Sequence, residues 1–200
     1  IAEEHDLLVI SDEIYEYIRY DNRPHISPAS IPSLRDRCIT IMGVSKTFSI
    51  TGWRLGYAVA RPELAQSLTL TSDIYYICAP TPLQVGAAAG FESPKSFFDD
   101  LQTKYQKKRD LFCGALTQAG LTPVIPQGAY YVLADISHLG FESAKTAALT
   151  LLEQCKVAAV PGSAFYHGND GEKFLRFCFA LEDDLVESAA ERIQSFGSSR

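Results

Sequence analysis

The sequence lacks any apolar run long enough to cross a membrane. Its longer runs, such as Leu7–Ile10, fall far short of the roughly 20 residues that a membrane helix needs. The formal net charge is −6, so a nucleic-acid surface is not expected. The chain also has no charged and then apolar leader that would mark it for secretion. These absences favour a cytoplasmic protein that binds neither membrane nor nucleic acid.

The sequence is equally poor in clustered metal ligands. Its five cysteines are odd in number and form no CxxC pair, and its four histidines are scattered. Such spacing predicts neither a metal site nor a disulfide framework. Reduced, mostly buried thiols are the simpler interpretation for a cytosolic protein. The cysteines are Cys38, Cys78, Cys113, Cys155 and Cys178.

The first half of the chain has the pattern of a sheet with helices. Hydrophobic residues make up 46% of the sequence, enough to bury a core. Pro62 and Pro82 stand where a first helical turn accepts proline, which predicts helices over 62–71 and 82–93. Short apolar runs that end in polar residues are typical of strands buried on both faces. They occupy Leu7–Ser11, Ile39–Gly43 and Leu55–Ala60.

The second half is expected to form a smaller unit. A long helix is predicted from about Pro94 to Ala119, ending at Gly120. Its solvent-facing side would carry the basic residues Lys104, Lys107, Lys108 and Arg109. Further strands are predicted over Tyr130–Ala134, Val157–Val160 and Phe174–Phe179, and further helices near 142–154 and 182–196. We therefore expect an α/β fold, with the end of a large sheet domain over 1–93 and a bridging helix plus a small α+β domain over 94–200.

The start of the chain predicts that it is a fragment. The sequence begins at Ile1 with no Met, within residues that have a helical pattern, and it continues directly into an apolar strand. We therefore expect the 200 residues to be the carboxy-terminal half of a longer protein.

Two polar residues follow the first predicted strand. Asp12 comes where open α/β sheets carry ligand-binding residues, at the end of a buried strand. Tyr15 lies three residues further on. Each also has a structural explanation, because Asp12 would cap a helix that begins at Glu13 and Tyr15 would be a core aromatic.

A second group of polar residues follows the next predicted strand. Ser45 and Lys46 follow the strand Ile39–Gly43, and Arg54 comes eight residues after the lysine. Among small and apolar neighbours a lysine is partly desolvated, which lowers its pKa and leaves an amine that attacks carbonyl groups. A hydroxyl group and an arginine fork suit a phosphate. The alternative is that Lys46 and Arg54 are solvated loop charges.

Five motifs in this order resemble the class I and II aminotransferases, which are pyridoxal-phosphate (PLP) enzymes of fold type I. The resemblance covers essentially the whole chain and is greatest with the branch of kynurenine, aromatic, methionine and aspartate aminotransferases. The motifs are Ser11-Asp12-Glu13-Ile14-Tyr15, Ser45-Lys46-Thr47-Phe48-Ser49-Ile50-Thr51-Gly52-Trp53-Arg54, Pro126-Gln127-Gly128-Ala129-Tyr130-Tyr131, Val160-Pro161-Gly162-Ser163-Ala164-Phe165 and Leu175-Arg176-Phe177.

The resemblance implies a role for six residues. Lys46 would hold PLP as a Schiff base and act as the catalytic base. Asp12 would pair with the pyridine nitrogen of the cofactor, which keeps the ring an electron sink, and Tyr15 would bind its phenolic oxygen. Ser45 and Arg54 would bind the phosphate. Arg176 would bind the substrate α-carboxylate with its planar fork.

The sequence departs from the family pattern at one position. Many relatives carry a phosphate-binding serine three residues before the lysine, where this chain has Gly43. Ser45 would take over that role. In relatives the loop that corresponds to Tyr75 and Tyr76 reaches the active site of a neighbouring subunit, so the resemblance also implies a homodimer.

The implied reaction is a ping-pong amino transfer between an L-amino acid and a 2-oxo acid. Two alternatives stay open. Related cysteine-sulfur β-lyases use the same anchoring residues, and some transcription regulators carry an aminotransferase-like sensing domain. The intact Arg176 and the Ser45–Lys46 pair favour the enzyme. The resemblance further implies that the fragment alone is inactive, because relatives take the phosphate loop and much of the dimer interface from the preceding half.

Overall fold

The computed structural model describes residues 1–198 and divides into two compact units, Ile1–Leu101 and Gln102–Arg200. The division falls within the longest helix, α4 (Lys95–Gln118), which confirms the long helix expected from the sequence. Within residues 1–198 no helix is both long and apolar enough to span a bilayer. The two sequence-based domains, 1–93 and 94–200, stay a prediction.

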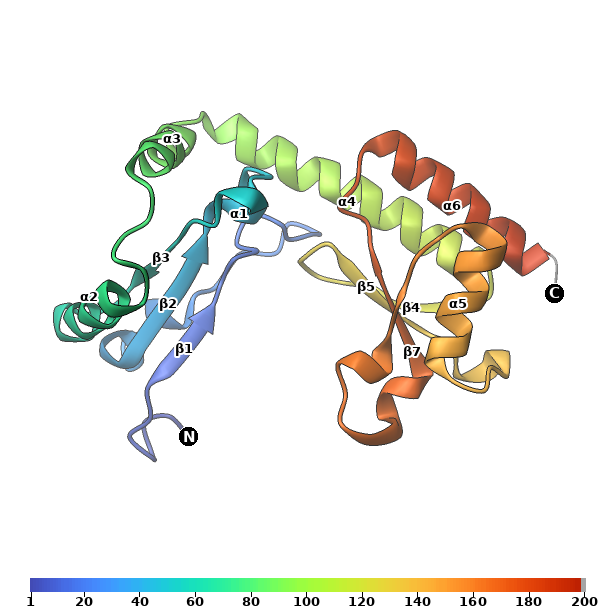
Figure 1. Ribbon diagram of the computed structural model, residues 1–200, viewed down its shortest axis with the longest axis horizontal. Coiled ribbons are helices and arrows are strands. Elements are labelled where there is room, and N and C mark those ends of the chain that lie inside the picture. Colours follow the sequence, from blue (N-terminus) through green and yellow to red (C-terminus); the bar gives the residue numbers. More distant parts are fainter. Residues whose placement is uncertain (199–200) are drawn as a thin grey trace. The chain divides into compact units, whose positions relative to one another are not determined.

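The first unit contains a three-stranded mixed sheet (Figure 1). Strand β1 (Val9–Asp12) pairs in parallel with β2 (Cys38–Gly43), which pairs antiparallel with β3 (Gly56–Val59). Asp12 lies opposite Ile41, and Gly43 lies opposite Gly56. The carboxyl ends of β1 and β2 and the beginning of β3 therefore meet at one edge of the sheet.

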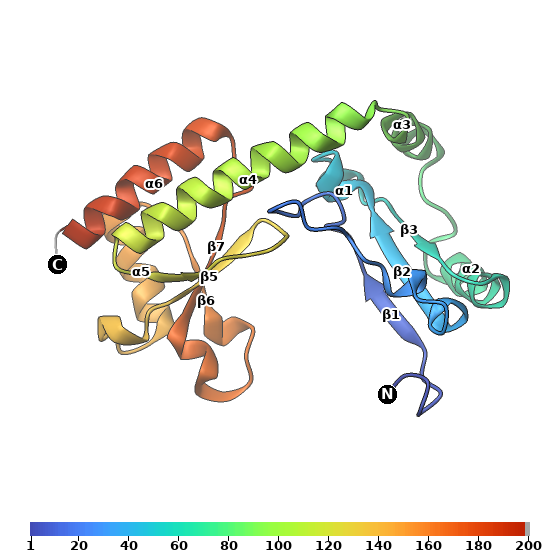
Figure 2. The same ribbon diagram turned by 180° about the vertical axis from the view of Figure 1, so that it is seen from behind.

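The helices of the first unit are α1 (Val44–Thr47), α2 (Pro62–Tyr76) and α3 (Thr81–Phe91). As expected, a proline opens both α2 and α3. Helix α2, which lies beside β3 (Figure 2), extends five residues beyond its predicted end at 71 because no glycine or proline interrupts residues 72–76. It ends at Ile77, whose φ of 66° is left-handed.

The expectation that the first strands are buried on both faces is wrong for β1 and β3, whereas the first three residues of β2 are buried. Leu8 is 55% exposed, Ile10 71% and Val59 57%, and β1 begins two residues later than predicted. The reason is that β1 and β3 are the outer strands of a sheet of only three, so neither has a second neighbour within these residues.

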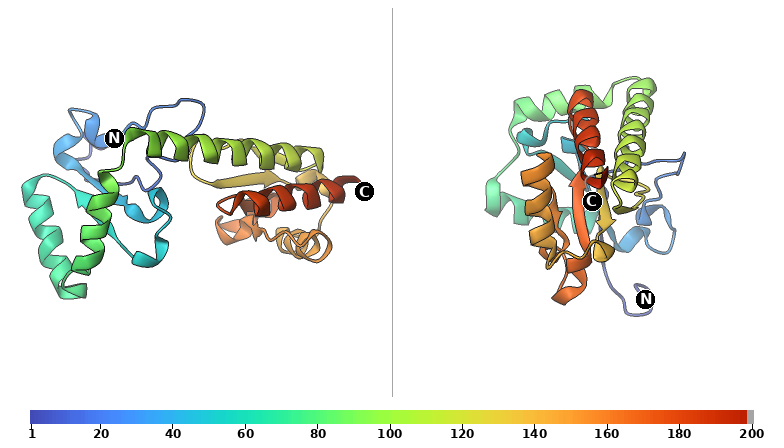
Figure 3. Two further views of the ribbon diagram at one scale, coloured as in Figure 1. Left: turned by 90° about the horizontal axis from the view of Figure 1, so that it is seen from above. Right: turned by 90° about the vertical axis from the view of Figure 1, so that its right-hand side faces the viewer.

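The second unit contains an antiparallel sheet, drawn in yellow to orange-red in Figure 3. The order of its strands is β4-β5-β7-β6. Its strands are β4 (Thr122–Val124), β5 (Tyr131–Asp135), β6 (Val160–Pro161) and β7 (Phe174–Cys178). The sequence analysis missed β4, whose central residue is a proline that is tolerated because the strand lies at an edge. Strand β6 is also shorter and later than the predicted 157–160.

The core of the second unit lies on one face of this sheet. Helices α5 (Ala144–Cys155) and α6 (Asp183–Ser198) pack against each other. Side chains alternate between the faces of a strand, and the inward set, Val132, Ala134, Leu175 and Phe177, is almost fully buried. Tyr131, Leu133 and Arg176 lie on the opposite face, with Leu133 paired to Arg176 across the strands.

Arg109 is not on the solvent-facing side of α4, as the sequence analysis expected. Its side chain is buried. Its Nε and Nη2 bind Asp110 Oδ1 at 2.8 and 2.7 Å, and its Nη1 donates to the Pro126 carbonyl at 3.2 Å. The guanidinium therefore ties the helix to the segment before β5, and a charge is accepted inside because it is paired.

Candidate functional site

The predicted site residues of the first unit lie at the edge where β1 and β2 end. Asp12 is the last residue of β1, and Ser45 and Lys46 lie two and three residues beyond the end of β2. Arg54 stands two residues before β3, which begins at the same edge. Carboxyl ends of parallel strands are where open α/β sheets bind ligands.

Asp12 does not cap a helix. It is exposed, and its Oδ1 accepts a hydrogen bond from the Ile14 amide at 3.3 Å. The chain then makes turns instead of the expected helix at Glu13, with backbone bonds from Glu16 N to the Glu13 carbonyl and from Ile18 N to the Tyr15 carbonyl. Tyr15 is partly buried in this turn.

Lys46 lies in the single-turn helix α1, half-buried, next to the buried Ser45. The loop that follows is held by packing. Gly86 and Gly90, one turn apart on α3, lie against the rings of Trp53 and Phe48, and a Cβ at either glycine would come within 3.0 to 3.1 Å of a ring carbon. Because these contacts are close, the loop that carries Lys46 is fixed to α3. Trp53 thus packs against α3.

Gly43 lies against Ile14, which belongs to the turn after Asp12. A Cβ at this position would lie 2.9 Å from Ile14 Cδ1. A serine here would therefore require the end of the Ile14 side chain to shift.

Arg54 has a left-handed backbone, with φ of 56°, and its Nη1 donates to the Thr51 carbonyl at 3.0 Å. Its exposed side chain borders an open hollow of about 990 Å³ between β3 and α2. Asp12, Tyr15 and Lys46 do not line this hollow.

Arg176 lies in the second unit, on the open face of the sheet. Its guanidinium carbon is 4.3 Å from the ring centroid of Tyr131 and 4.1 Å from that of Phe165, so the charged group lies over two aromatic rings. Within residues 1–198, no carboxylate pairs with it. Arg176 and both rings line a hollow of about 500 Å³ whose other walls are apolar.

The sequence analysis assigned no role to Tyr131 or Phe165. Both stood in quoted motifs, but stacking depends on strand register and loop path, which the motifs do not reveal. The loop of Phe165 is fixed by a close backbone crossing. A Cβ on Gly162 would come within 2.8 Å of the Phe174 carbonyl oxygen, and Phe165 N bonds to the Gly162 carbonyl at 2.8 Å.

No group of three or more His, Cys, Asp or Glu side chains in residues 1–198 is arranged to hold a metal ion. Cys38, Cys113 and Cys155 are buried, Cys78 and Cys178 are exposed, and all five are free thiols.

Comparison with known proteins identifies a family. The model for "Aminotransferase class I and II" matches residues 1–193. Members of this family depend on PLP. A kynurenine–oxoglutarate transaminase of Dictyostelium discoideum is 36% identical over 92% of the chain. An aspartate aminotransferase of Pyrococcus abyssi is 37% identical over 96% of it. The chain covers 47% and 49% of these two proteins, so it spans about half the length of the curated relatives it matches.

Solved structures agree. An aromatic aminotransferase of Pyrococcus horikoshii OT3 matches with a TM-score of 0.89 and 35% identity, over 100% of this chain and 53% of that one. An N-succinyldiaminopimelate aminotransferase of Mycobacterium tuberculosis matches with a TM-score of 0.91 and 28% identity, over 98% of this chain and 51% of its own. These matches confirm the expected α/β architecture of fold type I. The chain belongs to the class I and II aminotransferases.

Proposed function

We propose that these residues belong to a PLP-dependent aminotransferase. The chain spans about half the length of the family members it matches. The enzyme would move an amino group between an L-amino acid and a 2-oxo acid in a ping-pong sequence. The observation that carries this proposal is the convergence of Asp12, Ser45, Lys46 and Arg54 at one edge of the sheet, in a chain that belongs to this family.

The chemistry of these side chains fits the cofactor group by group. Lys46 offers an amine for the aldehyde, and Asp12 a carboxylate for the pyridine nitrogen. Tyr15 offers a phenol for the ring oxygen. Ser45 and Arg54 offer a hydroxyl group and a guanidinium for the phosphate. When bound, PLP supplies an electron-withdrawing ring that stabilises negative charge at the substrate Cα.

The residues of the chain would share the remaining work. After a substrate amine has replaced it, Lys46 Nζ would accept the proton from the substrate Cα. Its half-buried position next to Ser45 supports this role, because a held amine loses less freedom when it acts. Arg54 would be the main phosphate ligand of the pair, since its side chain is exposed while that of Ser45 is buried.

Arg176 would bind the substrate α-carboxylate. Contacts with two rings restrict the orientation of the planar guanidinium, and a carboxylate binds best along the edge of such a group. The apolar walls of the adjoining hollow support the same role, because they strengthen the attraction between the two charges.

We also propose a cytoplasmic homodimer. Apolar side chains at the end of α2 support the dimer, since Ile74, Tyr75 and Ile77 are exposed, Tyr75 by 81%. Large exposed apolar surfaces are typical of surfaces that a partner covers.

Incubation of the full-length protein with PLP, 2-oxoglutarate and a panel of amino acids tests the proposal. We expect glutamate to form only when both an amino acid and the 2-oxo acid are present, and Lys46→Ala to abolish it. Lys104→Ala is the matched control, since Lys104 is an exposed lysine of α4. Release of pyruvate and ammonia without need of a 2-oxo acid would favour a β-lyase and contradict the proposal.

A further inference from the structure

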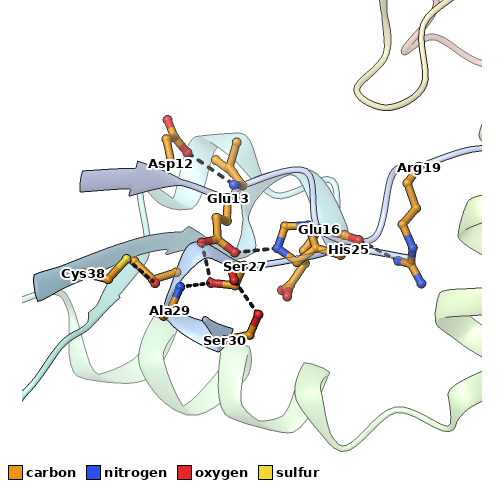
Figure 4. Close-up of polar contacts among 11 residues, drawn as sticks. Asp12, Glu13, Glu16, Arg19, His25, Ser27, Ala29, Ser30 and Cys38 are labelled. Atoms are coloured by element: carbon orange, nitrogen blue, oxygen red, sulfur yellow. Dashed lines mark hydrogen bonds and ion pairs between the residues drawn. The ribbon is translucent and has the colours of Figure 1, made fainter. Parts of the chain in front are cut away.

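Glu13, directly after Asp12, has a carboxylate that points away from the cofactor edge. Figure 4 shows the side chains of Asp12 and Glu13 on opposite sides of the chain, as expected for neighbours at the end of a strand. The Asp12 side is exposed, whereas only 4% of the Glu13 side chain is exposed. A buried carboxylate needs partners to offset its loss of water.

Both oxygens of that carboxylate have a partner from a distant part of the loop. Glu13 Oε2 lies 2.5 Å from His25 Nε2, and Oε1 accepts a hydrogen bond from Ser27 Oγ at 2.7 Å (Figure 4). Burial alone would raise the pKa of Glu13. Hydrogen bonds with Ser27, His25 and Ser11 outweigh burial and lower that pKa below its ordinary value of 4.5. The carboxylate is therefore held in its charged form.

Ser27 is itself held by further hydrogen bonds. Ser27 Oγ also accepts from the Ala29 amide at 3.3 Å, which caps the short helix Pro28–Ser30, and Ser30 Oγ donates to the Ser27 carbonyl at 2.7 Å. On the other side, the Glu13 amide donates to the Ile41 carbonyl of β2 at 2.9 Å. Glu13 thus joins the end of the sheet to the short helix Pro28–Ser30 through Ser27.

Stability alone is a weak reason for such an arrangement, because replacing a buried ionic group by apolar side chains is often neutral or stabilising. A buried, hydrogen-bonded charge does fix the orientation of its side chain and of the backbone that carries it. Asp12 is the last residue of the β1–β2 ladder, and residues 13–18 form irregular turns. Beyond Asp12, no regular ladder of hydrogen bonds therefore orients Tyr15, which lies two residues after Glu13.

We propose that Glu13, His25 and Ser27 form a clamp that positions Asp12 and Tyr15 toward the cofactor. The inference rests on the proposed function of those two residues. Glu13 is then a positioning residue, because its carboxylate faces the loop and acts through its chain neighbours. Breaking the clamp would leave the sheet intact and let the Asp12–Tyr15 turn take several orientations.

The test uses the full-length protein and four variants: Glu13→Gln, Ser27→Ala, His25→Leu and His25→Gln. His25→Gln keeps a hydrogen-bond donor, so it should behave more like the wild type than His25→Leu. Matched controls are His167→Leu and Ser33→Ala, which alter an exposed histidine and an exposed serine of the chain.

The first measurement needs no cofactor. Amide hydrogen exchange of the PLP-free protein is followed by mass spectrometry for peptides that cover 11–18 and 38–43. Loss of one charge-assisted hydrogen bond should speed exchange of the 11–18 peptide by about tenfold in Glu13→Gln and His25→Leu. The 38–43 peptide and both control variants should exchange at the wild-type rate.

The second measurement follows the absorption of bound PLP against pH. The clamp predicts a shifted transition in Glu13→Gln and His25→Leu, partial recovery in His25→Gln, and a larger fall in kcat than rise in KM. Faster exchange of both peptides with an unshifted transition would overturn the proposal and make the clamp merely structural. Wild-type behaviour of all variants would also overturn it. If the wild-type protein neither takes up PLP nor forms glutamate, the proposed function itself fails, and the clamp's role in it falls too.

Discussion

The two units of the chain differ in how completely they bury their sheets. In the second unit, β5 and β7 alternate between buried and half-exposed residues, and the inward side chains of both are almost fully buried. In the first unit, all four residues of β3 are exposed, and the apolar Ile10 of β1 is 71% exposed. The second unit therefore closes its core with its own residues, and the first does not.

The proposed cofactor-binding and substrate-binding residues also lie in different units. The proposed cofactor ligands Asp12, Tyr15, Lys46 and Arg54 lie in the open unit, whereas Arg176 lies in the closed one. Substitutions in the open unit should therefore change what happens at the cofactor, and those in the closed unit should change substrate binding or folding.

The largest expected effect is that of Asp12→Asn in the full-length protein. The amide keeps a hydrogen bond but not the charge that protonates the pyridine nitrogen. A carboxylate partner shifts such a pKa by about 1–3 units, so exchange of the substrate Cα proton should slow by about 10- to 1000-fold while PLP still binds. Proton exchange is followed by NMR in deuterated water. A wild-type rate would remove Asp12 from the cofactor site.

Arg176→Lys should weaken binding of the amino acid and leave binding of PLP unchanged. Lysine keeps the charge but loses the planar fork over Tyr131 and Phe165. Loss of a bidentate contact should lower kcat/KM for the amino acid by about 10- to 100-fold, mainly through KM. The affinity for PLP, measured by titration of the PLP-free protein, should not change. Unaltered kinetics would mean that Arg176 has only a structural role.

The two units should also differ in how much the loss of an apolar side chain lowers the free energy of unfolding. Leu175→Ala, in the closed core, should lower the free energy of unfolding by about 3 kcal/mol. Ile10→Ala should lower it by less than about 0.5 kcal/mol in the 200-residue chain, where Ile10 is exposed. Urea unfolding of both variants gives the comparison.

The same Ile10→Ala change in the full-length protein should cost about 2 kcal/mol or more, because residues outside this chain would cover β1. Equal effects in the two proteins would show that nothing covers the strand. The 200-residue chain alone should also associate and form no glutamate, since its open strand edges and apolar surface invite pairing.

The smallest effect concerns the closed unit alone. Lys108 Nζ lies 2.8 Å from Asp183 Oδ1, at the start of α6. This hydrogen bond, together with the charge of Lys108, lowers the pKa of Asp183 below its ordinary value of 3.8. The contribution to stability is thus complete above that value and is lost as pH falls through the lowered pKa.

Lys108→Met should therefore lower the thermal midpoint slightly at neutral pH, and the difference from the wild type should shrink as pH falls below 3.8. Thermal unfolding followed by circular dichroism at several pH values measures both. A difference that does not depend on pH would mean that the pair adds nothing to folding.

Much of the fold could be predicted from the sequence, because prolines and glycines mark where several strands and helices begin or end. The prolines at 62 and 82, the apolar run before Gly43 and the break at Gly120 all marked real boundaries. Strand β4 was not predicted, because Pro123 is a poor strand residue. Proline is tolerated there because β4 is an edge strand, which depends on tertiary pairing. The exposure of Ile10 could not be predicted, because an apolar run indicates that a strand is to be covered. It does not indicate whether the covering residues lie in the same chain.

For the candidate site, residue types and their places after strands could be predicted, but their supports could not. Asp12 and Lys46 were found from strand ends and motifs. The rings beside Arg176 and the partners of Glu13 come from residues far apart in sequence, and no local pattern joins Glu13 to His25 or Tyr131 to Phe165.

The central claim is that Lys46 anchors the cofactor. The full-length protein is loaded with PLP, reduced with borohydride and digested, and the modified peptide is located by mass spectrometry. The account predicts a single phosphopyridoxyl group on Lys46, and none after reduction of Lys46→Arg. A modification on Lys95, Lys104 or another lysine, retained in Lys46→Arg, would contradict it.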